Sequence, residues 1–124
     1  MKAPNLRDYR KFRAELVSDG WRTPNTYCRE FASPTNIPSI YLFLLVNDQY
    51  FDKAFVAYVG MSTKLLQRLT GHPVWAEMDQ PGYWAMQWFK PTERADLRAV
   101  ECGYIAKFDP PWNINGKPRG VILS

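Results

Sequence analysis

Two apolar, β-prone runs separated by a short polar stretch constrain the fold of this chain more than any other feature. The first run covers residues 40–46 and the second covers residues 54–59, with a polar connection that begins at residues 47–49. Runs of this length and composition are typical of two antiparallel strands joined in a hairpin. We therefore expect a sheet built around this hairpin.

The hairpin is predicted to bring two tyrosines together. In a symmetric hairpin centred between residues 49 and 50, Tyr41 lies directly opposite Tyr58. Directly opposed residues project their side chains from the same sheet face, about 5 Å apart. We therefore expect the two phenols side by side on one face, at the open end of the hairpin. Taken singly, each tyrosine is more readily explained as a residue that packs on a half-buried strand.

Helix and strand signals outside the hairpin predict an α+β fold, in which a small antiparallel sheet of about three strands is flanked by helices. An extra N-terminal helix is expected from Asn5, its N-cap, to Val17, before the stop signal at Asp19 and Gly20. The other predicted elements are a helix from Ser62 or Thr63 to Gly71, a strand over residues 83–89, a helix from Thr92 to Phe108, and a short strand or packed tail over residues 121–123.

Length and composition predict one compact domain. The chain has 124 residues, of which 46% are hydrophobic, and this is enough to fill a core. We interpret residues 1–38 as a basic N-terminal helix and irregular segment packed on a domain of residues 39–124. No apolar stretch is long enough for a membrane span, so no membrane partner is expected. Cys28 and Cys102 are too few for a disulfide scaffold, which predicts a reducing, cytoplasmic location.

Positive charge is concentrated near the N-terminus. Residues 1–36 carry seven Lys or Arg against four acids, so +3 of the net charge of +4 lies there. Such a segment fits a surface that contacts nucleic-acid phosphates, and equally a solvated helix face rich in arginine. The candidate DNA contacts are Arg7, Arg10, Lys11 and Arg13, together with Lys64 and Arg68 further along the chain.

A carboxylate interrupts the apolar stripe of the last predicted helix. The stripe consists of Leu97, Val100, Tyr104, Ile105 and Phe108, and Glu101 falls inside it. A carboxylate that faces a core is costly unless a cation or hydrogen bonds compensate it. Either an arginine at the edge of the stripe pairs with Glu101, or Glu101 binds a divalent metal. A single carboxylate suits Mg²⁺, which keeps most of its hydration shell.

Arg68 and His72 are predicted to share one face of the helix that follows the hairpin, because they are four residues apart. An arginine fork matches the geometry of a phosphate and stabilises charge that accumulates on it. His72 is the single histidine of the chain. A histidine at a helix C-terminus is also explained by its interaction with the last carbonyl groups.

Taken together, six short motifs resemble those of the GIY-YIG nuclease superfamily. They are Ser39-Ile40-Tyr41, Tyr58-Val59-Gly60, Arg68, His72, Glu101 and Pro111-Trp112-Asn113, in this order along the chain. The similarity extends from about residue 39 to residue 113 and covers most of the predicted domain. Ser39 stands where the first glycine is usual, and Met61 stands where some members have a basic residue.

The resemblance implies a metal-dependent endonuclease that hydrolyses DNA phosphodiester bonds with one Mg²⁺, or with Mn²⁺ in its place. It implies that Glu101 holds the metal and that Arg68 contacts the scissile phosphate. Tyr41 and Tyr58 would orient the phosphate and the attacking water. We favour Tyr58 as the general base with assistance from His72, although the two tyrosines could exchange roles. Asn113 would complete the wall of the site by hydrogen bonding.

Several functions remain compatible with the sequence. A nuclease of phage, mobile-element or restriction type fits the resemblance, and a homodimer or a targeting partner protein would supply specificity or a second cut. The alternative is a non-catalytic nucleic-acid-binding module that retains the nuclease fold. A zinc-finger or HNH-type nuclease is excluded, because one histidine and two cysteines cannot supply the ligands.

Overall fold

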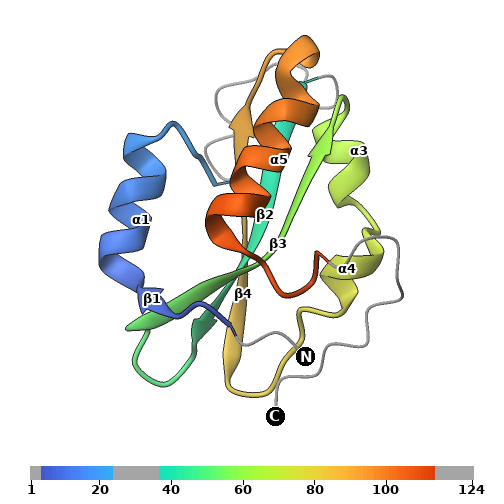
Figure 1. Ribbon diagram of the computed structural model, residues 1–124. Coiled ribbons are helices and arrows are strands. Elements are labelled where there is room, and N and C mark those ends of the chain that lie inside the picture. Colours follow the sequence, from blue (N-terminus) through green and yellow to red (C-terminus); the bar gives the residue numbers. More distant parts are fainter. Residues whose placement is uncertain (1–3, 24–36, 114–124) are drawn as a thin grey trace.

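The computed structural model describes residues 4–23 and 37–113, which are organised around a four-stranded antiparallel sheet (Figure 1). The strands are β1 (Arg7–Asp8), β2 (Ser39–Asn47), β3 (Lys53–Ser62) and β4 (Tyr83–Pro91), in the order β1-β3-β2-β4. The helices are α1 (Tyr9–Ser18), α3 (Leu65–Leu69), α4 (Pro73–Ala76) and α5 (Leu97–Phe108), and α5 is preceded by a short 3₁₀ helix, η2 (Arg94–Asp96). This confirms the α+β class. The additional strand is β1, whose two residues pair with the start of β3.

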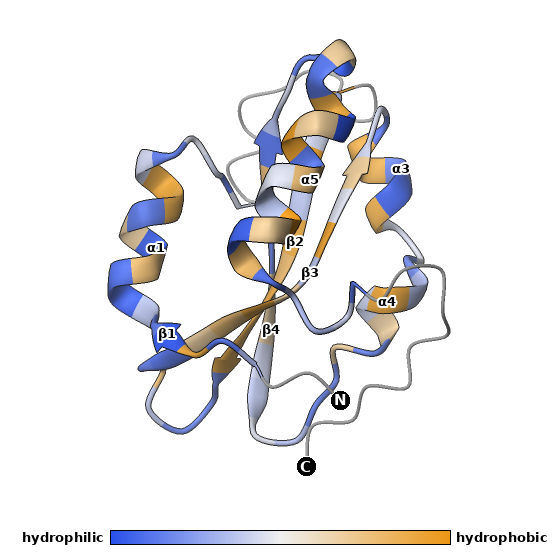
Figure 2. Ribbon diagram, viewed as in Figure 1, coloured by the Kyte–Doolittle hydropathy of each residue, from blue (hydrophilic) through white to orange (hydrophobic). Residues whose placement is uncertain are grey.

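Helices cover both faces of the sheet, so its central strand is buried on both sides. We call one side the α5 face; α1 and α5 pack there on Ile40, Leu42, Leu44 and Val46 of β2. We call the other side the α3 face; α3 and α4 pack there on Tyr41, Phe43 and Leu45. Burial on both sides explains why β2 is an unbroken apolar run rather than an alternating pattern. Figure 2 shows hydrophobic colouring along β2 and β3.

A β-bulge in β3 changes the pairing that a symmetric hairpin would have. Near the turn, Val46 pairs with Ala54 and Leu44 with Val56. The next pairs along β2 are Phe43 with Tyr58 and Tyr41 with Gly60, so Ala57 is one extra residue in β3. The predicted direct opposition of Tyr41 and Tyr58 is therefore wrong, because the pairs near the turn are centred on residue 50 and the bulge shifts the later pairs by one further residue.

The same bulge places Tyr58 on the tyrosine-bearing face. Continuing the register found near the turn would set Tyr58 opposite Leu42, on the α5 face. One extra residue reverses the facing of every residue after it. Tyr58 therefore packs with Tyr41 on the α3 face. The prediction that both tyrosines share one face is confirmed, but the cause is the bulge and not a direct pairing of the two residues.

Helix α1 packs on the α5 face through Phe12 and Leu16. Its N-cap is Asp8, whose side chain accepts a hydrogen bond of 3.0 Å from the backbone N–H of Lys11, so the predicted cap at Asn5 is wrong. A side-chain acceptor at the cap position satisfies one of the unpaired N–H groups of the first turn. The predicted stop at Asp19 and Gly20 is confirmed.

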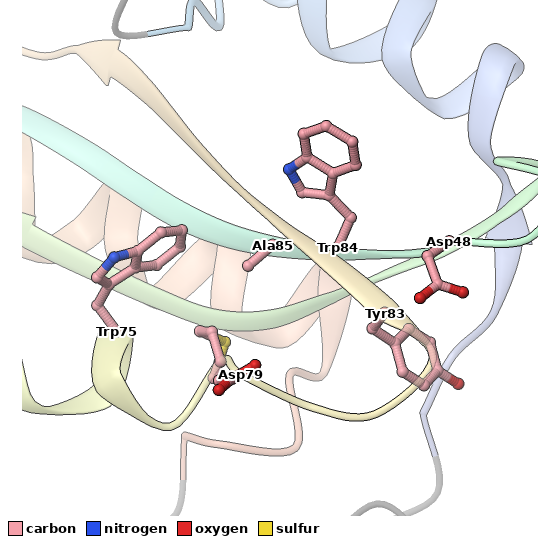
Figure 3. A pocket seen from close by; sticks show the side chains of 7 residues that line it. Asp48, Trp75, Asp79, Tyr83, Trp84 and Ala85 are labelled. Carbon is pink, nitrogen blue, oxygen red and sulfur yellow. The ribbon is translucent and has the colours of Figure 1, made fainter.

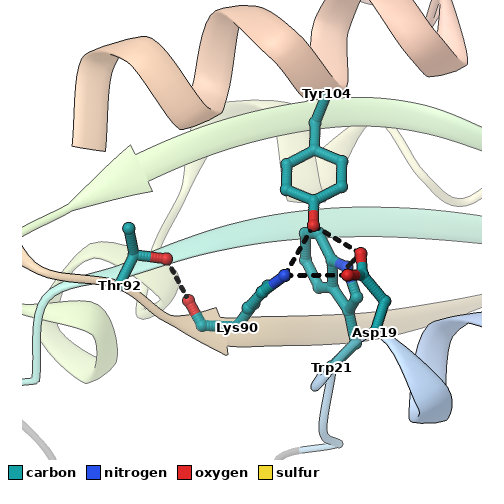
Figure 4. Close-up of polar contacts among 5 residues, drawn as sticks. All are labelled: Asp19, Trp21, Lys90, Thr92 and Tyr104. Carbon is teal, nitrogen blue, oxygen red and sulfur yellow. Dashed lines mark hydrogen bonds and ion pairs between the residues drawn. The ribbon is translucent and has the colours of Figure 1, made fainter. Parts of the chain in front are cut away.

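A polar cluster ties the end of α1 to β4 and α5 (Figure 4). Lys90 Nζ lies 3.0 Å from Asp19 Oδ1 and 2.7 Å from the Tyr104 hydroxyl. The Tyr104 hydroxyl donates a second hydrogen bond to Asp19. The indole N–H of Trp21 donates to the same carboxylate at 3.2 Å. Three elements far apart in the sequence are thereby joined at one carboxylate.

The region after the hairpin differs from the single helix predicted up to Gly71. Helix α3 ends at Leu69, Gly71 has a positive φ of 69°, and α4 begins at Pro73, where no helix was predicted. A glycine adopts this left-handed conformation without strain, and proline favours the first position of a helix. Together they divide the segment into two short helices.

The last helix also begins later than predicted, because η2 occupies the segment before Leu97. Its predicted apolar stripe is confirmed, since those side chains pack on the α5 face. The predicted tail over residues 121–123 and the predicted irregular segment with Cys28 lie outside the described residues. Among the helices of the described ranges, none is long and apolar enough to cross a membrane.

Candidate active site

Four rings gather on the α3 face and form what we call the tyrosine–histidine cluster: Tyr41, Phe43, Tyr58 and His72. The ring centroids of Tyr41 and Tyr58 are 6.2 Å apart. Phe43 stacks on Tyr58 at 5.6 Å, directly across the strand pair. His72 lies 5.5 Å from Tyr41 and 5.4 Å from Tyr58 between centroids. The predicted proximity of the two phenols and the histidine is therefore present in the structure.

The hydrogen bonds of His72 fix its tautomer. The backbone N–H of Val74 donates to Nδ1 at 3.0 Å, and Nε2 lies 2.7 Å from the Tyr41 hydroxyl. A neutral imidazole has one donor and one acceptor nitrogen. Because Nδ1 accepts a hydrogen bond, Nε2 carries the proton and donates it to the Tyr41 oxygen. The hydroxyl proton of Tyr41 is then available to donate to another group.

His72 holds this position as the N-cap of α4 and not as a residue of α3. The prediction that Arg68 and His72 share one helix face is wrong, because α3 ends before His72. The sequence also allowed the His72 ring to interact with carbonyl groups at a helix C-terminus. Its Nδ1 instead accepts the N-cap hydrogen bond from the Val74 N–H. Pro73, at the start of α4, was the sequence signal for this arrangement, because proline favours the first position of a helix.

Arg68 approaches the cluster from α3. Its interaction with the Tyr41 hydroxyl is the main cause that raises the pKa of Arg68, and Tyr58 adds to it. Burial raises the pKa of Tyr41 strongly, and the opposing effect of Arg68 is smaller. Tyr41 is therefore a protonated, neutral phenol at neutral pH, beside a permanent cation. The Tyr41 hydroxyl therefore keeps its proton and can donate a hydrogen bond at neutral pH.

Gly60 allows the Tyr41 ring to lie across β3. The two residues face each other in adjacent strands. A Cβ atom at position 60 would clash with Cζ and the hydroxyl oxygen of Tyr41. Glycine is therefore required at position 60, because the ring of Tyr41 on the neighbouring strand can lie only over a residue that has no side chain.

Asn113 acts on the strand that carries Tyr58. Its amide group accepts from the Val59 N–H and donates to the Val59 carbonyl, both at 2.8 Å. The N–H of Trp112 donates to the Ala57 carbonyl at 2.9 Å. This segment thus pairs with β3 along its edge, at the bulge and directly after it. These hydrogen bonds hold Asn113 beside the strand that carries Tyr58, and its contribution to a wall of the site stays a prediction.

Glu101 lies on α5 and is half-buried. A single site would place Glu101 and Arg68 on the face that carries the tyrosines; for Glu101 this expectation is wrong, because α5 covers the opposite face of the sheet. Helices α5 and α3 both contact β3, which runs between them (Figure 1). Burial raises the pKa of Glu101, and Arg98 opposes this weakly. Over the described ranges, the Glu101 carboxylate makes no hydrogen bond and no ion pair.

The described residues offer few side chains that could bind a metal ion together. Within residues 4–23 and 37–113, no three His, Cys, Asp or Glu side chains gather in a group that could hold a metal ion. A half-buried carboxylate without a partner fits a cation that retains most of its water ligands, as Mg²⁺ does. Glu101 therefore fits a water-rich site with a single protein ligand and does not fit a closed cage of protein ligands.

The predicted DNA-binding residues divide into two groups. A pocket of about 380 Å³ lies beside the cluster and is lined by Ser62, Thr63, Lys64, Gln67, Arg68, Thr70 and Gly71. Arg10, Lys11 and Arg13 are exposed on α1, on the other side of the sheet. Arg7 instead packs its guanidinium 5.0 Å from the ring centre of Phe12. The structure thus brings two of the six predicted contacts to the candidate site.

Ser39 occupies the position where the resemblance has its first glycine. Its hydroxyl is buried, and it has no hydrogen-bond partner in the part of the chain that the structure describes. The side chain therefore adds no polar contact to the candidate site, and the strand passes through this position as regular β structure.

No protein-family model, curated protein or solved structure gives a significant match to the chain.

Proposed function

We propose that this protein is a metal-dependent endonuclease that hydrolyses DNA phosphodiester bonds. The observation that carries the proposal is the position of the Tyr41 hydroxyl, which accepts a hydrogen bond from His72 and interacts with Arg68, beside Tyr58. A fixed donor, a permanent cation and a second phenol lie together, and the cation, Arg68, also lines the polar pocket. This is a set of groups that suits a phosphate, and it agrees with the GIY-YIG resemblance.

Each group has a distinct task in this proposal. Arg68 binds non-bridging oxygens of the phosphate and stabilises the negative charge that grows on them during displacement. The Tyr41 hydroxyl donates a hydrogen bond to the same phosphate. Its oxygen already accepts a hydrogen bond from His72, so its own proton is free for this contact. His72 acts through Tyr41 and is therefore a positioning residue.

Tyr58 is the proposed general base. A phenol acts as a base only as its phenolate, so Tyr58, with which Arg68 interacts, first releases its hydroxyl proton to solvent. The phenolate then takes a proton from water as the water oxygen attacks phosphorus, and the bond from phosphorus to the leaving sugar oxygen breaks. The leaving oxygen receives its proton from solvent. A cation held by Glu101 would add positive charge that offsets the charge of the phosphate.

Partners follow from this chemistry. The substrate is DNA, and the exposed basic residues of α1 are additional candidates for backbone contacts outside the site. A single site cuts one strand, so a double-strand break would require a homodimer or two successive nicks. We place this activity in the cytoplasm, as the cysteine content predicts.

A plasmid-nicking assay tests the proposal. Supercoiled plasmid should be nicked with Mg²⁺ and should remain intact with EDTA. Arg68→Lys should lower the rate by about 10²-fold or more, since a lysine cannot hold two phosphate oxygens as the planar fork does. Arg94→Lys, an exposed position in η2, is the matched control and should leave the rate unchanged. Equal rates in both variants would remove Arg68 from the mechanism.

A second candidate is a nucleic-acid-binding module without catalysis. It is favoured by one observation: the contacts of the described residues do not join Glu101 to the tyrosine–histidine cluster. Under this hypothesis the folded protein would bind plasmid DNA and would cut it with neither Mg²⁺ nor Mn²⁺. The same nicking assay, accompanied by a gel-shift measurement, separates the two candidates.

A further inference from the structure

A second pocket (Figure 3) lies on the α3 face, at the end of β2 opposite to the pair of Tyr41 and Gly60. Here the start of β4 pairs with the end of β2, as Tyr83 faces Asn47. The pocket has a volume of about 390 Å³ and is lined by Asp48, Trp75, Met78, Asp79, Tyr83, Trp84 and Ala85. The nuclease proposal uses none of these residues.

The walls of this pocket are two aromatic rings held in place from behind. Trp75 of α4 packs against Phe43 at 5.0 Å between ring centroids, and Tyr83 packs against Phe55 at 5.7 Å. The small side chain of Ala85 lies between them on β4 and leaves the space open. Trp84 also borders the pocket, and Figure 3 shows its ring on the other side of β4.

Two carboxylates give the pocket its charge. Asp48 and Asp79 are both exposed, and within the described ranges neither side chain has a hydrogen bond or an ion pair. The neighbouring Asp52 differs, because the Asn47 side chain donates to its carboxylate. Two unpaired carboxylates thus face one pocket on a protein whose net charge is +4. Such a pocket repels phosphate and attracts a cation.

Exposed aromatic residues extend the surface beyond the pocket. Tyr50, Phe51 and Trp84 have exposed fractions of 71%, 39% and 59%. Phe51 has a φ of 53°, a conformation in which a bulky residue is strained, and its ring lies 5.4 Å from that of Trp84. Strained residues are found chiefly where function requires them, and exposed apolar patches mark interaction sites. This patch therefore has the properties of a docking surface.

We propose that the pocket binds the guanidinium group of an arginine that a partner protein presents while it docks on Tyr50, Phe51 and Trp84. A planar guanidinium stacks on aromatic faces and donates hydrogen bonds to carboxylates at its edge. Trp75 and Tyr83 supply the faces, and Asp48 and Asp79 supply the acceptors. Because the pocket is open on one side, a single arginine buries little area there, and the exposed aromatic rim must contribute the remaining affinity. The proposal is independent of the nuclease proposal.

The test uses two capped pentapeptides, Gly-Leu-Arg-Leu-Gly and the same peptide with citrulline in place of arginine. Citrulline keeps the planar shape and removes the charge. Binding is followed by NMR through the indole N–H signals of Trp75 and Trp84, which Trp→Phe variants assign. The arginine peptide should shift both signals and bind about tenfold more tightly than the citrulline peptide.

The matched variants are Asp48→Asn combined with Asp79→Asn, and Asp96→Asn as the control that removes one carboxylate elsewhere on the surface. The double variant should lose about tenfold in affinity for the arginine peptide, and the control should bind as the parent does. Near-UV circular dichroism checks that both remain folded. If the double variant unfolds, Asp79→Asn alone replaces it, with a loss of about threefold expected.

Three results would overturn the inference. Equal binding of both peptides would show that the pocket recognises shape and not charge. A shift of the Trp75 signal by cytidine, with none by the arginine peptide, would make the pocket a nucleobase site. Binding of N-acetyl-arginine amide as tightly as the arginine peptide would show that the ligand is a small molecule and not a docked protein.

Discussion

The two faces of the sheet differ in how completely their helices cover them. On the α5 face, helices of 10 and 12 residues bury an apolar core. On the α3 face, the helices have only five and four residues, and the polar groups of Tyr41, Tyr58, His72 and Arg68 lie among the packed rings. A long helix buries a whole strand, whereas two short helices joined at a turn leave room for pockets at both ends. The comparison teaches that the α5 face is covered more completely, and that most groups of the proposed site lie on the less completely covered α3 face.

The largest expected effect is that of Glu101→Gln, the one proposed site residue on the well-covered face. The amide keeps the shape and removes the charge that attracts a divalent cation, so metal-dependent nicking should be lost while DNA binding persists. Parent-like nicking in this variant would assign all of the chemistry to the α3 face. The measurement is the nicking rate over a series of Mg²⁺ concentrations.

Glu101→Gln should also raise the free energy of unfolding at neutral pH. Burial raises the pKa of Glu101, so the ionised carboxylate destabilises the fold at neutral pH, and protonation relieves this as the pH falls through the raised pKa. Glu101→Gln should therefore be more stable than the parent at pH 7, and this gain should shrink toward pH 4. Denaturant unfolding at both pH values measures it.

Tyr58→Phe comes next in expected size. Loss of a general base lowers activity by about 10²- to 10⁴-fold, and removal of the hydroxyl from a half-buried ring should change stability little. Tyr41→Phe should lower activity less. It should lower stability by about 1–3 kcal/mol, because it leaves the buried Nε2–H of His72 without its acceptor. Parallel nicking and unfolding measurements distinguish the two variants, and equal losses in both would contradict the assigned roles.

Gly60→Ala tests the close approach of the two central strands. The new Cβ would displace the Tyr41 ring, which should break its hydrogen bond to His72 and lower the nicking rate by about 10²-fold. Gly103→Ala is a suitable control, since a Cβ at that exposed helix position meets no atom within 4 Å. Unchanged activity in Gly60→Ala would mean that the position of Tyr41 is not critical.

The smallest expected effect is that of Asp19→Asn, at the polar cluster on the rim of the α5 face. We expect a loss of about 1 kcal/mol in stability and an unchanged nicking rate. Burial alone would raise the pKa of Asp19, but its hydrogen bonds from Tyr104 and Lys90 lower it overall. The penalty should therefore be present above pH 3.8, the ordinary value, and disappear as the pH falls through the lowered pKa. A change in nicking rate would connect this face to function.

The sequence was sufficient for features that rest on periodicity. The hairpin runs and the stripe of Leu97 to Phe108 were predictable because apolar spacing reports directly which side of an element is buried. The early end of α3 and the cap at His72 depend on local turn geometry around Gly71, where competing signals lie within a few residues. The bulge at Ala57 has no compositional signal at all. The pocket between Trp75 and Tyr83 requires the tertiary arrangement of two elements, which spacing along the chain does not report.

The bulge at Ala57 has a consequence for anyone who transplants this hairpin into a new scaffold or shortens it by design. The length of the turn can change with little effect on the tyrosines. The sheet face on which each tyrosine lies depends on the number of residues between it and the first paired residues of the strands, and the turn is not part of that number. Deleting one residue at the bulge would leave the composition of β3 almost unchanged and would rotate Tyr58 to the wrong side. A library that varies this hairpin should therefore treat the number of residues in β3 as fixed and the loop as free.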